Sequence, residues 1–325
     1  ISIEDYNKEC RKAVMKYKNV WDDLTTKMGY WVDMDKPYIT YENDYIESVW
    51  FLLKMLYDKK LLYKGYTIQP YSPAAGTGLS SHELNLPGCY KMVKDNTVVA
   101  QFKVFQNSKF KIQNLTLNKE QGINDEVYLL AWTTTPWTLP SNTALAVGKD
   151  ITYVAVKTYN RYTGKRIIAI LANDLLYKYF DLVNSATLID IGKDSETTMD
   201  IEKFDSYKFG QTNIPWYIIS LFKGKVLEGL HYEQLLPYAQ PLDGAEPFKV
   251  ILGDFVSTEE GTGIVHIAPT FGADDMRVAK QNGISGILVK DENGDLIPLV
   301  DKRGRFVKEM QDDIWGFAGE LVKEE

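Results

Sequence analysis

Three consecutive threonines, Thr133–Thr135, directly follow a run of apolar residues that predicts a strand. Pro136 and Pro140 then hold the next residues extended and remove two backbone donors. Such a segment presents hydroxyls and free backbone groups at the end of a strand, a common place for ligand-binding residues. The other interpretation is a Ser/Thr turn in which the hydroxyls bond their own backbone. Residue types and spacing alone leave both interpretations open.

A second segment, residues 261–275, predicts a turn, a buried strand, a loop with Pro and Gly, and the start of a helix. His266 lies at the end of the strand, and Asp274 and Asp275 lie in the first turn of the helix. The positive end of the helix dipole favours an ionised carboxylate, which would bind an ammonium group. The simpler alternatives are acidic residues that only stabilise the helix start and a hydrogen-bonded core histidine.

The rest of the composition argues against several other chemistries. The chain of 325 residues contains two cysteines and three histidines, without the HExxH spacing of a zinc hydrolase, so we predict no metal site. A net charge of −7 is unlike that of a dedicated nucleic-acid-binding protein. No apolar run approaches the ~20 residues that cross a membrane. Two distant cysteines suggest a reducing compartment, and we expect the cytoplasm.

The elements before residue 95 are predicted to be helical. Apolar residues between positions 45 and 57 recur at helical spacing and predict one buried helix face, with Gly65 as the C-terminal cap. Residues 66–70 predict a short strand, which a loop rich in Gly and Ser follows. We therefore divide the chain into a helical connecting segment with the base of an insertion, residues 1–95, and a second domain, residues 96–325.

The second domain is predicted to be mainly β. Its predicted strands are 98–105, 126–132, 144–147, 153–157, 166–171, 249–256 and 263–267. Two short helices, 173–180 and 273–282, interrupt them. Short strands at this spacing with few, peripheral helices predict an α+β fold with a barrel-like or sandwich-like β domain.

The two chemistry-bearing segments resemble one protein family. Residues 132–142, Trp-Thr-Thr-Thr-Pro-Trp-Thr-Leu-Pro-Ser-Asn, are similar to the threonine-rich peptide of the isoleucyl-tRNA synthetase editing domain, and residues 261–275 resemble its second editing motif. Residues 29–50 resemble the segment that leads into this insertion. Thr135 stands where the related valyl and leucyl enzymes usually have Arg, which favours the isoleucyl enzymes. The resemblance covers nearly the whole chain, and both ends suggest a piece of a longer protein.

This resemblance implies an aminoacyl-tRNA synthetase fragment that hydrolyses the ester of mischarged valyl-tRNA(Ile). Water would attack the ester with help from a terminal ribose hydroxyl of the tRNA, Asp275 would hold the amino group, and His266 would exclude isoleucine. Asn142 would position the ester or the loop. Thr133, Thr134 and Thr135 would contact the aminoacyl group and the terminal adenosine. The other residues that we expect at the substrate are Trp132, Trp137, Gly261, Ala268 and Asp274.

The resemblance also implies partners and cofactors. The chain lacks sequences like HIGH and KMSKS, so the full-length enzyme would use ATP elsewhere, and we expect no cofactor here. Many relatives carry a zinc-binding Cys-x-x-Cys where this chain has Ser-Pro-Ala-Ala at 72–75. The expected partners are the acceptor end of tRNA(Ile), a valine or valyl-adenylate moiety and the rest of the synthetase, with no membrane.

Three other functions remain open at this point. The first two are a catalytically inactive tRNA-binding module and a connector within the same synthetase. The third is a metal-dependent hydrolase, which fits the scattered histidines poorly. Two stretches, 103–124 and 195–213, are interpreted as lineage-specific elaborations to which the sequence assigns no role.

Overall fold

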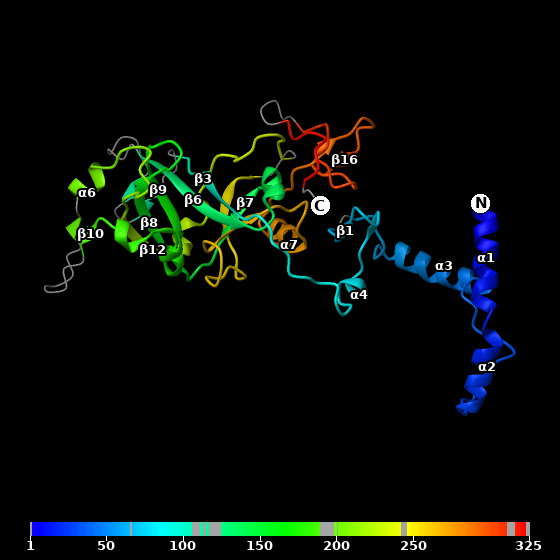
Figure 1. Cartoon of the computed structure of the whole chain (residues 1–325). Helices are drawn as coiled ribbons and strands as arrows, with labels where there is room; N and C mark the ends of the chain where they lie inside the picture. Colours follow the sequence, from blue (N-terminus) through cyan, green and yellow to red (C-terminus); the bar gives the residue numbers. More distant parts are fainter. Residues whose placement is uncertain are drawn as a thin grey trace. The chain divides into compact units, whose positions relative to one another are not determined.

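The computed structural model describes residues 2–65, 67–105, 111–112, 115–116, 125–188, 198–199, 201–241, 246–310 and 316–322. It divides into two compact units, residues 1–66 and 67–325 (Figure 1). Among these described residues, no helix is both long and apolar enough to cross a membrane. The predicted boundary between residues 95 and 96 separates functional parts of the chain rather than compact units, and it stays a prediction.

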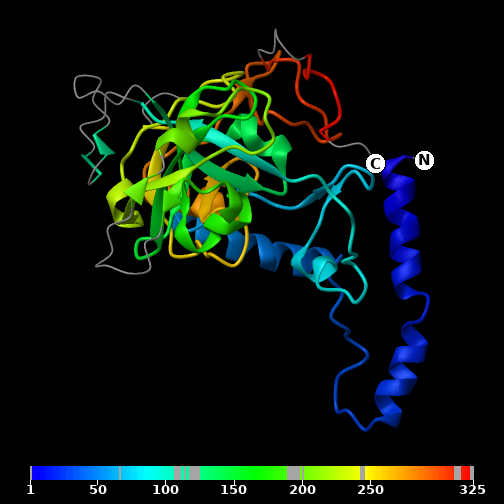
Figure 2. The same ribbon diagram turned by 60° about the vertical axis from the view of Figure 1, so that its left-hand side comes forward.

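The first unit consists of helices: α1 (Ile3–Met15), α2 (Lys18–Lys27) and α3 (Asn43–Asp58). The hydroxyl of Ser2 caps α1 by accepting a hydrogen bond from the Asp5 amide over 3.1 Å. In Figures 1 and 2, α1 and α2 lie nearly end to end. The prediction of helices in this part of the chain is confirmed.

Two details of this unit were predicted wrongly. Helix α3 ends at Asp58 and Lys60 adopts a left-handed conformation with φ 60°, so Gly65 is not its cap. The predicted buried face of α3 contains no buried residue; its stripe Tyr45, Val49 and Leu53 is only half-buried. Apolar spacing shows which face of a helix can be covered, and a covering surface must come from elsewhere.

The second unit is built on two sheets, whose strands run in colour from the cyan of β3 through green to yellow in Figure 1. The five-stranded sheet has the order β12-β8-β9-β6-β3, and the three-stranded sheet the order β13-β7-β14. The strands of the first sheet are β3 (Val98–Lys103), β6 (Glu126–Thr133), β8 (Thr152–Tyr159), β9 (Arg166–Ala172) and β12 (Tyr217–Lys223). Those of the second are β7 (Ala144–Val147), β13 (Lys249–Leu252) and β14 (Ile264–Ile267).

The two sheets pack face to face over one apolar core. Because successive residues of a strand point to opposite faces, Val127, Leu129 and Ala131 of β6 enter this core while Leu130 points away. The opposite face of the five-stranded sheet carries a second core, which includes Leu176 and Trp216. On the outer face of the smaller sheet, helix α7 (Ala273–Gln281) supplies buried apolar side chains. The unit is therefore layered, with the two sheets in the middle.

The remaining elements are short. The helices and turns are α4 (Ser81–Leu84), η2 (Pro136–Ser141), η3 (Asn173–Leu175), α5 (Leu176–Tyr179), η4 (Leu182–Asn184), α6 (Ile201–Asp205) and η5 (Gly224–Leu227). The two-residue strands are β1 (Tyr71–Ser72), β2 (Thr77–Gly78), β4 (Lys111–Ile112), β5 (Leu115–Thr116), β10 (Thr187–Leu188), β11 (Thr198–Met199), β15 (Val289–Lys290) and β16 (Leu296–Ile297). The predicted strand 66–70 is absent from the described residues 67–70, since pairing starts at Tyr71.

The α+β prediction is confirmed, but the barrel is not closed. Among the described strands, the edge of β3 connects toward β13 only through the isolated bridges Val104–Tyr232 and His231–Lys249, and β12 does not pair with β14. The arrangement is closer to the sandwich alternative, because strands β13 and β7 are too short to continue a ladder around the core. The two predicted elaborations, 103–124 and 195–213, lie partly outside the described residues.

Candidate active site

The threonine-rich segment leaves β6 and turns through η2. Thr133 is buried, while Thr134 and Thr135 are exposed. The hydroxyl of Thr133 accepts a hydrogen bond from the Thr135 amide over 3.0 Å and lies 3.3 Å from the Thr135 hydroxyl. This is the self-bonded Ser/Thr turn that the sequence left open, and it still leaves the Thr134 side chain facing solvent.

Thr138 joins this segment to the second one. Its Oγ1 donates to the Thr135 carbonyl oxygen over 2.8 Å and lies 3.1 Å from Nε2 of His266. Since the hydroxyl has a single proton and the Thr135 carbonyl takes it, we assign the proton of that contact to Nε2, with Thr138 as acceptor. His266 is then a neutral imidazole whose Nδ1 is an acceptor. This nitrogen is buried and has no hydrogen-bond partner among the described residues.

The electrostatics of His266 agree with that assignment. The side chain is buried in β14, and burial lowers the pKa of His266 to about 4. At neutral pH the ring is therefore uncharged and poorly placed to exchange protons. A fixed, neutral ring is suited to shaping a pocket, and it also agrees with the core-histidine alternative.

The burial of His266 makes stability depend on pH. In the unfolded chain a histidine becomes protonated near pH 6.5, whereas in the folded protein His266 stays neutral until about pH 4. Its contribution to the free energy of unfolding is therefore complete above pH 6.5 and falls by about 3 kcal/mol as the pH drops to 4. We expect the chain to lose more stability over this interval than a His266→Gln variant, in denaturant titrations at matched pH. Equal losses for both proteins would contradict a buried, neutral His266.

Asp275 follows His266 on the chain through a tight loop. Its Oδ2 accepts a hydrogen bond from the Ala268 amide over 2.9 Å, and Oδ1 makes no hydrogen bond within the described structure. A Cβ atom on Gly272 would lie 2.7 Å from the Asp275 carboxyl carbon, so only glycine leaves room for this side chain. Asp275 is half-buried, with one oxygen held by the protein and one that makes no hydrogen bond among the described residues.

The pKa of Asp275 is shifted in the direction opposite to the effect expected of the helix start. Burial raises the pKa of the Asp275 carboxyl, the Ala268 amide lowers it, and the neighbouring Asp274 raises it further. The helix start alone therefore does not make this carboxylate more acidic than usual. Asp274 is exposed and pairs with Arg277 over 3.2 Å, as a residue that supports the start of α7 would.

Asn142 is buried and its amide is engaged within the protein. Its Nδ2 donates to the Ala144 carbonyl oxygen over 2.8 Å, and its Oδ1 accepts from the Tyr232 hydroxyl over 2.7 Å. A longer contact of 3.5 Å reaches the Ile267 carbonyl oxygen. Of the two roles considered for Asn142, these bonds favour the positioning of the loop.

The other residues that we expected at the substrate are not gathered at one place. A Cβ atom on Gly261 would lie 3.0 Å from the Trp132 ring, so these two pack together. Trp132 alternates with Thr133 along β6 and therefore lies on the other face of the sheet. Trp137 packs edge to face on Phe271 at 5.0 Å in a separate apolar cluster. Ala268 is buried and contributes its amide to Asp275. Their roles at a substrate stay predictions.

Sequence reasoning missed two residues of this arrangement. Thr138 lies within the quoted motif, but its position three residues after Thr135 across a turn was the only sign of a shared network. Thr270 is buried in the loop before α7, and its hydroxyl has no hydrogen-bond partner among the described residues. Like Nδ1 of His266, it is a buried polar group without a hydrogen-bond partner among the described residues.

Comparison with known proteins identifies the family. Residues 1–263 match the class I tRNA synthetases (I, L, M and V). The chain is 60% identical over 324 residues to the isoleucine–tRNA ligase of Cytophaga hutchinsonii, covering 100% of this chain and 26% of that protein. It is 53% identical over 306 residues to that of Porphyromonas gingivalis, covering 94% and 25%. The chain thus spans about a quarter of the length of these relatives.

A solved structure was also found. The crystal structure of the P.knowlesi cytosolic leucyl-tRNA synthetase editing domain is 15% identical to this chain, with a TM-score of 0.40, and the match covers 59% of this chain and 65% of that chain. That similarity is too low to support an argument about the site. The family match extends over most of the chain, and the identity to isoleucine–tRNA ligases extends over all of it. The chain therefore belongs to the class I tRNA synthetases, as the resemblance of its two motifs predicted.

Proposed function

We propose that this chain is the editing part of an isoleucine–tRNA ligase and hydrolyses the ester of valyl-tRNA(Ile). The observation that carries the proposal is the contact of 3.1 Å between Thr138 and His266, which joins the two motifs at one place. The Asp275 carboxylate is held by the amide of Ala268, which is the first residue after the same strand. The threonine hydroxyls and the neutral ring are thus in contact, and the carboxylate is bonded to the loop that follows the same strand.

The chemistry needs no protein nucleophile. An aminoacyl ester is already activated, so a water molecule that is held against its carbonyl carbon can add there directly. The bond from that carbon to the ribose oxygen then breaks, which releases valine and leaves a free hydroxyl on the tRNA. A terminal ribose hydroxyl of the tRNA would orient the water. Oδ1 of Asp275 would hold the substrate ammonium group and so fix the carbonyl beside it.

The size selection follows from the stiffness of His266. One methylene group gives a binding site only about 1–3 kcal/mol of discrimination, a limit for which the isoleucyl enzyme is itself the usual example. A pocket wall that clashes with the larger isoleucine side chain admits only the smaller valine. A site of this kind can therefore remove valine that was attached by mistake. His266 is buried and bonded to Thr138, so its ring resists displacement.

The helices of residues 2–65 would contact the rest of the synthetase. The apolar residues of α3 are exposed or half-buried in this chain, which supports a role as a surface for another part of the enzyme. We propose that this unit connects the editing part to the ATP-using part, and that the enzyme works in the cytoplasm.

The direct test is to mix the chain with valyl-tRNA(Ile) and to follow the loss of the ester. We expect hydrolysis well above the spontaneous rate, insensitive to chelators, and no ATP–pyrophosphate exchange because the ATP motifs are absent. With a net charge of −7, binding of tRNA should be weak and should weaken further with salt. Tight tRNA binding with an intact ester would instead support the inactive tRNA-binding module.

A further inference from the structure

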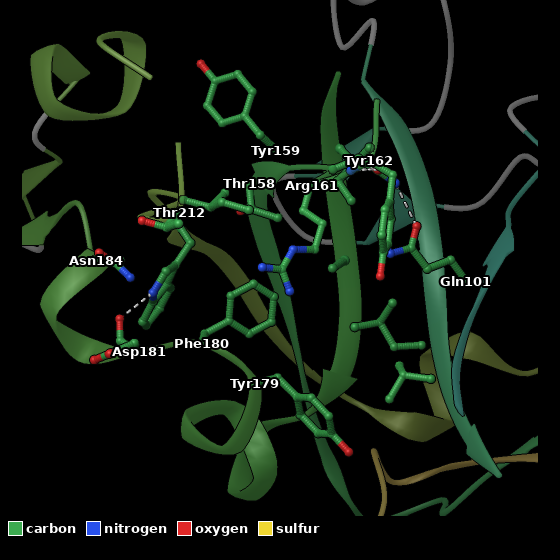
Figure 3. Close-up of a pocket in the computed structure, with 17 residues that line it drawn as sticks. Gln101, Thr158, Tyr159, Arg161, Tyr162, Tyr179, Phe180, Asp181, Asn184 and Thr212 are labelled. Atoms are coloured by element: carbon green, nitrogen blue, oxygen red, sulfur yellow. Dashed lines mark hydrogen bonds between the residues drawn. The ribbon is translucent and has the colours of Figure 1, made fainter. Parts of the chain in front are cut away.

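A cavity of about 410 Å³ lies on the outer face of the five-stranded sheet (Figure 3). Its floor includes Val99, Leu130 and Ala169, from β3, β6 and β9. Leu130 points away from the core between the sheets, whereas Thr133 lies on the other face of β6. The cavity is therefore separate from the proposed editing site, and its volume suits a small organic group.

Aromatic rings form much of its wall: Tyr162, Tyr179, Phe180 and Trp216. The polar tips of two of these rings are already bonded within the protein. The Tyr179 hydroxyl donates to the Gly261 carbonyl oxygen over 2.8 Å, and the Trp216 Nε1 donates to the Asp181 carbonyl oxygen over 2.8 Å. These rings are thus held in place and offer a ligand mainly their faces and edges.

The uncommitted polar groups lie at the rim. Arg161 has no hydrogen-bond or ion-pair partner among the described residues, and Figure 3 shows its guanidinium pointing toward the Phe180 ring. Gln101 accepts from Asn160 over 2.9 Å through Oε1, which leaves its Nε2 free to donate. Asn184, on the opposite side of the cavity, makes no side-chain bond in the described structure. The rim therefore offers a cation and two amides.

We propose that this cavity binds an unpaired nucleobase of an RNA strand. A base presents a flat π face to the rings, and its edge carries acceptors and donors for Arg161 and the amides. An aliphatic side chain or lipid would use the rings but would leave the guanidinium and amides without partners. A lone phosphate would use Arg161 but not the aromatic wall. The family acts on RNA, and this second site would operate whether or not the chain hydrolyses an ester.

The test is isothermal titration of the chain with adenosine 5′-monophosphate, with ribose 5-phosphate as the comparison ligand. We expect only the nucleotide to bind, and a short single-stranded oligoadenylate to displace it. Phe180→Leu and Arg161→Ala should each weaken binding at least about fivefold, because one stacked base accounts for much of such affinity. Arg303→Ala, an exposed arginine away from the cavity, is the matched control and should change nothing.

The outcomes separate this proposal from the editing function. Arg161 is exposed, so Arg161→Ala should fold normally even if Phe180→Leu does not. No nucleotide binding, binding that survives both substitutions, or equal binding of ribose 5-phosphate would each overturn the nucleobase site. A protein segment as the true occupant would leave the nucleotide unbound, and a site for the sugar would bind ribose 5-phosphate equally well. If the nucleotide binds as expected while valyl-tRNA stays intact, the editing proposal fails and the nucleobase site stands.

Discussion

Replacing Asp275 with Asn should lower the rate of valyl-tRNA(Ile) hydrolysis at least tenfold without unfolding the chain. The substitution removes the charge that would hold the substrate ammonium, an interaction that contributes about 1.5–3 kcal/mol when a charged group takes part. An Asn side chain can still accept the Ala268 amide through its oxygen, as Asp275 does over 2.9 Å. Because burial raises the pKa of Asp275, the neutral replacement should leave the melting temperature unchanged or raise it.

The matched control is Asp274→Asn. Asp274 is exposed and makes a surface ion pair with Arg277, which typically contributes about 0–1 kcal/mol. We expect its hydrolysis rate to stay within about twofold of the unchanged chain, since such a pair is far weaker than a desolvated one. A folded Asp275→Asn protein with normal hydrolysis would remove Asp275 from the site.

Acidification should lower the rate of hydrolysis, as the Asp275→Asn substitution does. The carboxylate must be ionised to hold an ammonium group, and burial raises the pKa of Asp275. Hydrolysis should therefore decline on acidification at a pH above the usual range for an aspartate. The residual rate of Asp275→Asn should lack that decline.

Replacing His266 with Ala should change which ester is cleaved. The ring is buried and fixed by Thr138, so its removal opens more space than one methylene group occupies. Forcing an extra methylene into a tight site costs about 1–3 kcal/mol, so we expect hydrolysis of isoleucyl-tRNA(Ile) to rise about tenfold or more. Rates of ester loss from valyl- and isoleucyl-tRNA(Ile), measured in parallel, give the ratio.

Two variants control for lost stability. His266→Gln retains a polar group for Thr138 and part of the bulk, so it should still spare isoleucine more than His266→Ala does. His82→Ala removes an exposed histidine and should behave like the unchanged chain. A His266→Ala protein that spares isoleucine and only slows on valine would make His266 a structural residue.

The sequence predicted most of the strands that carry the site. The alternation of apolar residues in β6 and the β-branched runs of β9 and β14 placed these strands within one or two residues of their observed ends. Strand β12 was missed although Tyr217–Lys223 has suitable residue types, because it is a half-exposed edge strand with an irregular register. Sheet closure was also not predictable, since it depends on how far strand edges reach and not on residue type.

The chemistry was harder to predict than the fold. Spacing identified Asp275 in the first turn of α7, yet its raised pKa depends on burial under a loop that folds back through Gly272. The contact between Thr138 and His266 joins residues 128 positions apart, and no local pattern signals it. Asn142 has the residue type of a catalytic group, but its partner Tyr232 comes from a distant segment.

One measurement tests the central claim most directly. The first-order rate of ester loss from valyl-tRNA(Ile) is compared at equal concentrations of the unchanged chain, the Asp275→Asn chain and buffer alone. The proposed editing function predicts a rate well above buffer for the unchanged chain and at least tenfold lower for the variant. An ester as stable with the unchanged chain as in buffer, under conditions where the chain is folded and binds the tRNA, would contradict it.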